Sequence, residues 1–101
     1  MQDQILFEWD PAKAAANLAR HGVSFEQAMA VFADRLALSV LDPMVPTDEG
    51  RWITIGAAGP AGLLLVVHTH SEVDAMTTIV RIISARRPTR NERRQYENES
   101  G

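Results

Sequence analysis

The chain has 101 residues, the length of one domain whose core can bury roughly 60–65% of the unfolded surface, and we expect residues 1–101 to form a single domain. Its 46% hydrophobic and 23% charged residues, with no cysteine and no apolar run of ~18 residues, exclude a disulfide scaffold, a thiolate metal site and a membrane helix, and favour a cytoplasmic globular protein. The net charge of −3 is unevenly distributed, because residues 1–80 carry −6 and residues 81–101, with six arginines, carry +3.

The first third of the chain predicts a short strand followed by two helices. Each helix starts after a residue whose side chain can cap free backbone amides, Asp10 for the first and Ser24 for the second. Gly22 can adopt the left-handed conformation that ends a helix, so it separates the two. The predicted elements are a strand at 5–9 and helices at 11–20 and 25–33.

Beyond residue 35 the apolar period changes from about 3.6 to 2, which predicts strands. Short turn sequences at 59–62 and 71–75 separate the last three strands, so these should pair as an antiparallel meander. The predicted elements are strands at 36–41, 51–57, 63–70 and 77–85 and a C-terminal helix at 89–98. This order predicts an α+β fold with a mainly antiparallel sheet of four to five strands, two N-terminal helices packed on it and a C-terminal helix.

Two faces of the first predicted helix differ in chemistry. Lys13, Asn17 and Arg20 share one face because they are spaced by three and four residues, and His21 lies near the same side. This row is either the solvated side of an amphipathic helix or a row of cations that faces a phosphate. Four small residues form another face, which predicts close packing on the sheet: Ala12, Ala15, Ala16 and Ala19.

Arg81 lies in a predicted strand that is apolar on both faces, between Ile79 and Ile83. Both faces of such a strand are covered, so we expect a central strand and a charge that needs a partner. The partner is either an acid, such as Glu8 or Asp34, or an external anion, and we favour the anion.

The three histidines are His21, His68 and His70. Their spacing matches no known metal signature, so we expect no metal. A general acid or base role for one of them is favoured, because histidine titrates near neutral pH.

The C-terminal segment 89–101 has a single large apolar residue, Tyr96, and therefore does not resemble an ordinary core helix. Three arginines near its start, Arg90, Arg93 and Arg94, are unfavourable there because of the helix dipole. The segment is either a solvated tail or an exposed arginine arm that binds RNA or an acidic partner, and we favour the arm.

Three separated stretches, taken in order, resemble the BrnT family of toxins over nearly the whole chain. They are residues 7–10 with Lys13, Asn17 and 21–26, then 51–56, and finally 81–86 with Thr89, 92–94 and 96–97. The sequence departs from the family at Arg87-Pro88, where Lys-Ala is common. The resemblance implies a RelE-like fold and a ribonuclease toxin of a type II toxin–antitoxin system that inhibits translation.

The resemblance also implies partners and site residues. The expected partners are an RNA substrate, a BrnA-type antitoxin and operator DNA bound only through the antitoxin, and no cofactor is expected. In metal-independent cleavage the ribose 2′-hydroxyl attacks the adjacent phosphate, and fixed cations stabilise the added charge. The expected catalytic residues are Arg81, Lys13 and Arg86, with His68 or His21 as proton carrier. The expected RNA-binding residues are Arg20, Asn17, Arg87, Arg90, Arg93, Arg94 and Trp52.

Two points stay open at the sequence level. Arg86 follows Arg81 by five residues, so strict alternation puts them on opposite faces unless the strand bends. The alternative function is a catalytically inactive RNA- or protein-binding module that acts through the arginine-rich C-terminal helix.

Overall fold

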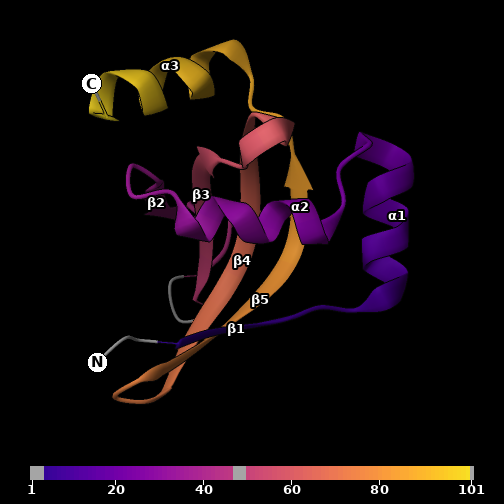
Figure 1. Cartoon of the computed structure of the whole chain (residues 1–101), viewed down its shortest axis with the longest axis vertical. Coiled ribbons are helices and arrows are strands. Elements are labelled where there is room, and N and C mark those ends of the chain that lie inside the picture. Colours follow the sequence, from indigo (N-terminus) through magenta and orange to yellow (C-terminus); the bar gives the residue numbers. More distant parts are fainter. Residues whose placement is uncertain (1–3, 47–49, 101) are drawn as a thin grey trace.

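The computed structural model describes residues 4–46 and 50–100. Within this part the fold is α+β, with a five-stranded mixed sheet and three α-helices (Figure 1). The elements in chain order are β1 (Gln4–Glu8), α1 (Pro11–His21), α2 (Phe25–Met29), a 3-10 helix (Ala30–Ala33), β2 (Leu38–Leu41), β3 (Arg51–Ala57), a second 3-10 helix (Gly59–Ala61), β4 (Leu63–Asp74), β5 (Thr77–Arg86) and α3 (Arg90–Ser100).

The sheet has the strand order β1-β5-β4-β3-β2. The predicted meander of β3, β4 and β5 is confirmed, and β2 is also antiparallel to β3, whereas β1 runs parallel to β5. The predicted turn at 71–75 is wrong, because β4 continues to Asp74. Residues 71–74 of β4 are exposed to solvent. A strand that is not buried does not need apolar residues, so the polar sequence was mistaken for a turn.

The capping residues start and end the N-terminal helices as predicted. Asp10 Oδ1 accepts a hydrogen bond from the Ala12 amide at 2.8 Å, and Gly22 takes the left-handed conformation with φ of 69°. Ser24 and Gln27 form a reciprocal capping box at the start of α2. The single helix predicted at 25–33 is divided, since α2 ends at Met29 and the chain tightens into a 3-10 helix.

The core lies on one side of the sheet, where α2 crosses β4 and β5 (Figure 1). Helix α1 stands beside the sheet next to β5 instead of across its face (Figure 1). The predicted packing of the alanine face of α1 is therefore wrong, since all four of those alanines are exposed. The largest fully buried side chains are Phe25, Leu64, Ile82, Val23, Val31 and Val66.

A bulge in β5 corrects the expected directions of its arginines. Val67 pairs with Ser84, but the next residue, His68, pairs with Ile82, so Ile83 is an extra residue in the ladder. Arg81 lies opposite Thr69 and Arg86 lies opposite Leu65, and both partners lie on the face of the sheet opposite to the main buried cluster. The bulge therefore places Arg81 and Arg86 on the same face of the sheet, although they are five residues apart.

Candidate functional site

An open pocket of about 240 Å³ lies between α1 and β5. The two elements bring together residues that are about 70 positions apart, so the site is a product of the tertiary fold. Lys13, Arg20 and His21 are exposed on α1, while Ile83 and Ser84 come from the bulged part of β5. The lining residues are Lys13, Ala16, Asn17, Arg20, His21, Ile83 and Ser84. The structure thus brings the cations of α1 together in one open pocket, and their contact with a phosphate stays a prediction.

Asn17 shares this pocket, but its side chain is used within the protein. It is 7% exposed, and its amide makes hydrogen bonds to the backbone of Val23 and Ala85. Both ends of its amide already have protein partners, which favours a structural role for Asn17 over the expected RNA binding.

Arg81 lies on β5 near the pocket, on an exposed surface. Its Nη1 is 3.4 Å from Glu8 Oε1, and both side chains are about half exposed. Glu8, one of the acids that the sequence offered as a partner, lies opposite Arg81 on β1, whereas the expected cover of this face of the strand is wrong at Arg81, because the side chain is exposed. A long contact between exposed charges is weak, so the Arg81 guanidinium keeps the capacity to bind a phosphate.

Arg86 is instead committed to an acid. Its two terminal nitrogens bind the Glu92 carboxylate at 2.8 and 3.0 Å in a bidentate pair. The pair lowers the pKa of Glu92 to about 2 and raises the pKa of Arg86, in each case chiefly through this hydrogen bonding. Glu92 also accepts the Thr89 amide, so Arg86 holds the start of α3 against the end of β5.

His68 is buried on the core side of the sheet, and only 4% of it is exposed. Its Nδ1 donates to the Thr69 carbonyl at 3.2 Å, so Nε2 accepts the 2.7 Å bond from the Thr54 hydroxyl. Burial lowers the pKa of His68, which keeps the ring neutral at pH 7. The ring also packs edge-on against Phe32. This burial and bonding favour a structural role for His68 over the expected role of proton carrier.

Trp52 and Arg87 lie apart from the pocket. Trp52 pairs with His68 and packs on the ring of His70 at a centroid distance of 5.6 Å, so it belongs to the core side of the sheet. Arg87 donates to the Ala61 carbonyl at 2.7 Å and thereby ties the end of β5 to the turn before β4. RNA binding by these two side chains stays a prediction.

Helix α3 is docked on the domain by polar contacts. Tyr96 donates its hydroxyl hydrogen to Asp34 Oδ2 at 2.6 Å, which lowers the pKa of Asp34 and raises the pKa of Tyr96. The alternative of a loose tail does not fit this arrangement. The arginines of α3 are nevertheless exposed, as predicted, and Arg93 lies 3.9 Å from Glu97. Sequence reasoning missed Asp34 and Tyr96 as a pair, since they are 62 positions apart.

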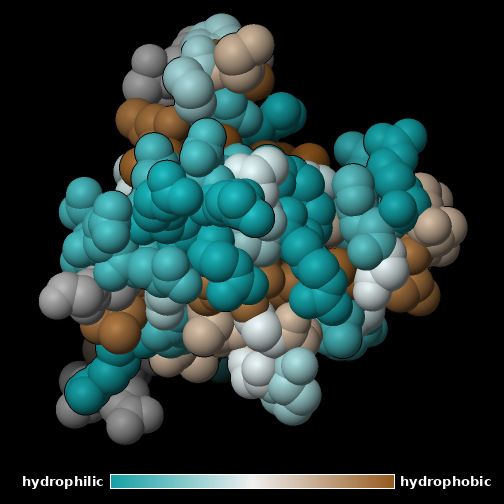
Figure 2. Space-filling model, turned by 90° about the horizontal axis from the view of Figure 1, so that it is seen from above, coloured by the Kyte–Doolittle hydropathy of each residue, from teal (hydrophilic) through white to brown (hydrophobic). Residues whose placement is uncertain are grey.

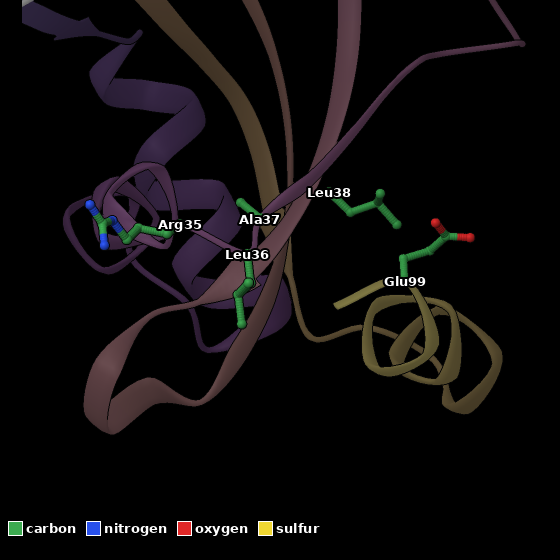
Figure 3. Close-up of a pocket in the computed structure, with 5 residues that line it drawn as sticks. All are labelled: Arg35, Leu36, Ala37, Leu38 and Glu99. Atoms are coloured by element: carbon green, nitrogen blue, oxygen red, sulfur yellow. The ribbon is translucent and has the colours of Figure 1, made fainter. Parts of the chain in front are cut away.

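A second pocket, of about 250 Å³, lies beside the C-terminal end of α3. It is lined by Arg35, Leu36, Ala37, Leu38 and Glu99. In Figure 3, Arg35 points away from Glu99, whereas Leu38 lies beside it. None of the predicted site residues lines this pocket, and its one arginine does not face its one acid. We therefore take the pocket between α1 and β5 as the functional site.

The surface around that site is mixed in polarity. Seen from above, α1 projects from the side of the molecule and shows both hydrophilic and hydrophobic residues (Figure 2). Leu18 is 52% exposed there, beside the exposed alanines. Within residues 4–46 and 50–100, no group of three or more histidine, aspartate or glutamate side chains is arranged to hold a metal ion. No helix of the described chain has the length and apolar character to cross a membrane.

Comparison with known proteins agrees with these observations. A family model described as the ribonuclease toxin BrnT of type II toxin–antitoxin systems matches residues 9–92. The crystal structure of the Brucella abortus ribonuclease toxin BrnT shares the fold, with a TM-score of 0.57 and 21% identity, over 86% of this chain and 99% of that chain. Comparison with curated protein sequences gives no match. Because the family model covers most of the chain, including both elements that form the pocket, the protein belongs to the BrnT family of ribonuclease toxins of type II toxin–antitoxin systems.

Proposed function

We propose that the chain is an endoribonuclease that cleaves RNA without a metal ion at the pocket between α1 and β5. The observation that carries this proposal is the gathering of Lys13, Arg20 and His21 in one open pocket. Arg81 lies on the same strand as Ser84, three residues and about 10 Å away along it. A phosphodiester bound between these cations would contact positive charge from both α1 and β5.

The proposed reaction starts from the ribose 2′-hydroxyl. As the 2′-oxygen bonds to phosphorus, the bond from phosphorus to the 5′-oxygen breaks, which leaves a cyclic phosphate and a 5′-hydroxyl. A base takes the proton from the 2′-hydroxyl, and an acid returns one to the 5′-oxygen. Lys13, Arg20 and Arg81 would bind the phosphate and stabilise the negative charge that it gains in the transition state. His21, the exposed histidine of the pocket, is the proposed proton carrier.

The exposed arginines of α3 suit a second role in the same function. Arg90, Arg93 and Arg94 are exposed on a helix that is held firmly at both Glu92 and Tyr96. A rigid row of arginines can contact successive phosphates of an RNA strand without reading its sequence. We assign these residues to RNA binding, outside the pocket where the bond breaks.

A BrnA-type antitoxin is the proposed inhibitor in the cytoplasm. Acidic groups of the antitoxin would neutralise Lys13 and Arg20, and apolar groups would cover Leu18 and the exposed alanines of α1. Operator DNA would be bound through the antitoxin, since the chain itself carries a net charge of −3.

RNA cleavage by the purified protein in the presence of a chelator tests this function. We expect products that end in a 2′,3′-cyclic phosphate, and a rate lowered ~10²–10³-fold in Lys13→Ala. Arg35→Ala is the matched control, because Arg35 is an exposed cation that lines the other pocket. A folded protein that leaves RNA intact but binds it through α3 would favour the alternative of an inactive binding module.

A further inference from the structure

We propose that Asn17 is a positioning residue for RNA cleavage, one that fixes α1 on β5 and so sets where the pocket cations stand. The inference rests on the proposed function, because it predicts a change in the rate of RNA cleavage. Because Asn17 is buried and its amide is bonded to the protein, we assign it a role in positioning and not in contact with the substrate.

The amide of Asn17 replaces a missing strand at the edge of β5. Strand β1 pairs with β5 from Thr77 only as far as Arg81, and beyond it no strand of the described chain continues on that side. Ala85 lies in this later stretch. Its N–H donates to Asn17 Oδ1 at 3.1 Å, and its carbonyl accepts from Asn17 Nδ2 at 2.8 Å. These are the two backbone bonds that a neighbouring strand would have made with Ala85.

The same side chain also ties α1 to the chain that follows it. Nδ2 donates a second hydrogen to the Val23 carbonyl at 3.0 Å. One amide thus links the helix, the segment after Gly22 and the last part of β5. An aspartate could not donate these hydrogens, and an alanine would leave three buried backbone groups without partners.

Little apolar burial competes with this link. In α1, all of whose residues the structure describes, Asn17 is the one buried residue, and Ala14 is partly buried against the core. Apolar contacts are non-directional and small here, so they do not specify how the helix is turned. The directional bonds of Asn17 therefore determine the position of α1 relative to β5.

This position matters because of where the cations lie on the helix. Lys13 precedes Asn17 by four residues and Arg20 follows it by three, so both share its face, one turn to either side. Ser84, which lines the pocket, is next to Ala85 in β5. A rotation or slide of α1 would therefore move both cations relative to the strand. A misplacement of about 1 Å can reduce a rate by roughly 10²-fold.

Two measurements on Asn17→Ala test the inference, one of cleavage and one of geometry. We expect kcat to fall at least about 10-fold while KM changes less, since the charges stay but their placement is lost. We also expect hydrogen exchange to accelerate at the Ala85 amide, while the Val66 amide inside the sheet stays protected. Assays are run at a temperature where each variant is folded by circular dichroism.

Thr54→Val is the matched control for loss of a buried polar side chain. Thr54 is 2% exposed and bonds to Ser39 and His68 on the core side of the sheet, away from α1. We expect it to lower the unfolding midpoint but to leave kcat unchanged. If Asn17→Ala does not fold, Asn17→Gln carries the test, because it retains the amide but lengthens the link to β5 by one methylene.

The outcomes separate this inference from the proposed function. An unaltered protein that does not cleave RNA contradicts the proposed function, whatever the variants do. If the unaltered protein cleaves RNA and a folded Asn17 variant cleaves it equally well, the positioning role is overturned. Equal losses of kcat in Asn17→Ala and Thr54→Val would overturn it too, because they would reflect general stability.

Discussion

At the scale of single residues, Glu92 serves two structural purposes. Its carboxylate accepts hydrogen bonds from both terminal nitrogens of Arg86 and from the Thr89 backbone amide. Thr89 Oγ1 in turn accepts a hydrogen bond from the Glu92 backbone amide. The capping box was readable from the sequence because its two residues are three apart. The bidentate pair was not, because it depends on the direction in which Arg86 leaves the bulged strand.

Replacing Glu92 by glutamine should destabilise the protein in a pH-dependent way. The carboxyl has a folded-state pKa of about 2, below its ordinary value of 4.5, so its contribution is present at neutral pH and is lost as pH falls from 4.5 toward 2. We expect Glu92→Gln to lower the free energy of unfolding at pH 7 by on the order of 2 kcal/mol, measured by urea denaturation. The difference from the unaltered protein should shrink toward pH 2.

Glu97→Gln is the control for that measurement, since Glu97 lies 3.9 Å from Arg93 on the exposed side of α3. Its effect on unfolding should be small at every pH. A difference for Glu92→Gln that stayed constant between pH 7 and pH 2 would show that the carboxylate charge contributes nothing.

At the scale of elements, the sequence predicted where most helices and strands begin because those signals are local. Asp10, Ser24 and Thr89 each precede a helix, and β3 has the predicted bounds. The packing of α1 was mispredicted because a row of alanines looks like a packing face, whereas the buried residue of the helix is an asparagine that bonds to β5. The bulge in β5 was missed because it is a property of the pairing with β4.

Helix α3 should loosen when its hydroxyl contact is removed. Tyr96→Phe deletes the hydrogen bond to Asp34, which joins the second half of α3 to the rest of the domain. We expect the free energy of unfolding to fall by about 1 kcal/mol and the amides of α3 to exchange faster, with the β4 amides unchanged. Equal exchange in Tyr96→Phe and the unaltered protein would mean that the Arg86–Glu92 pair alone holds the helix.

At the scale of the whole molecule, the opposing charges of the two chain segments support the proposed RNA binding by a protein that is acidic overall. The fold places Lys13 and Arg20 from the acidic N-terminal part beside β5, whose arginines belong to the basic C-terminal part. Composition showed that the two segments differ in charge. Only the tertiary fold shows that two cations of the acidic segment, Lys13 and Arg20, lie beside the basic segment. The electrostatic surface is therefore local, and a net charge of −3 does not describe it.

This local surface predicts the salt dependence of RNA binding. Each phosphate neutralised on a single strand contributes a slope of about −0.7 to the logarithm of the binding constant against the logarithm of salt concentration. We expect Lys13→Ala to make that slope shallower by roughly this amount, because it removes one pocket cation. The measurement uses a 2′-O-methyl RNA, which stays intact because it lacks the 2′-hydroxyl that acts as the nucleophile. Arg35→Ala should keep the slope of the unaltered protein, and identical slopes for all three proteins would mean that the RNA phosphates do not reach the pocket.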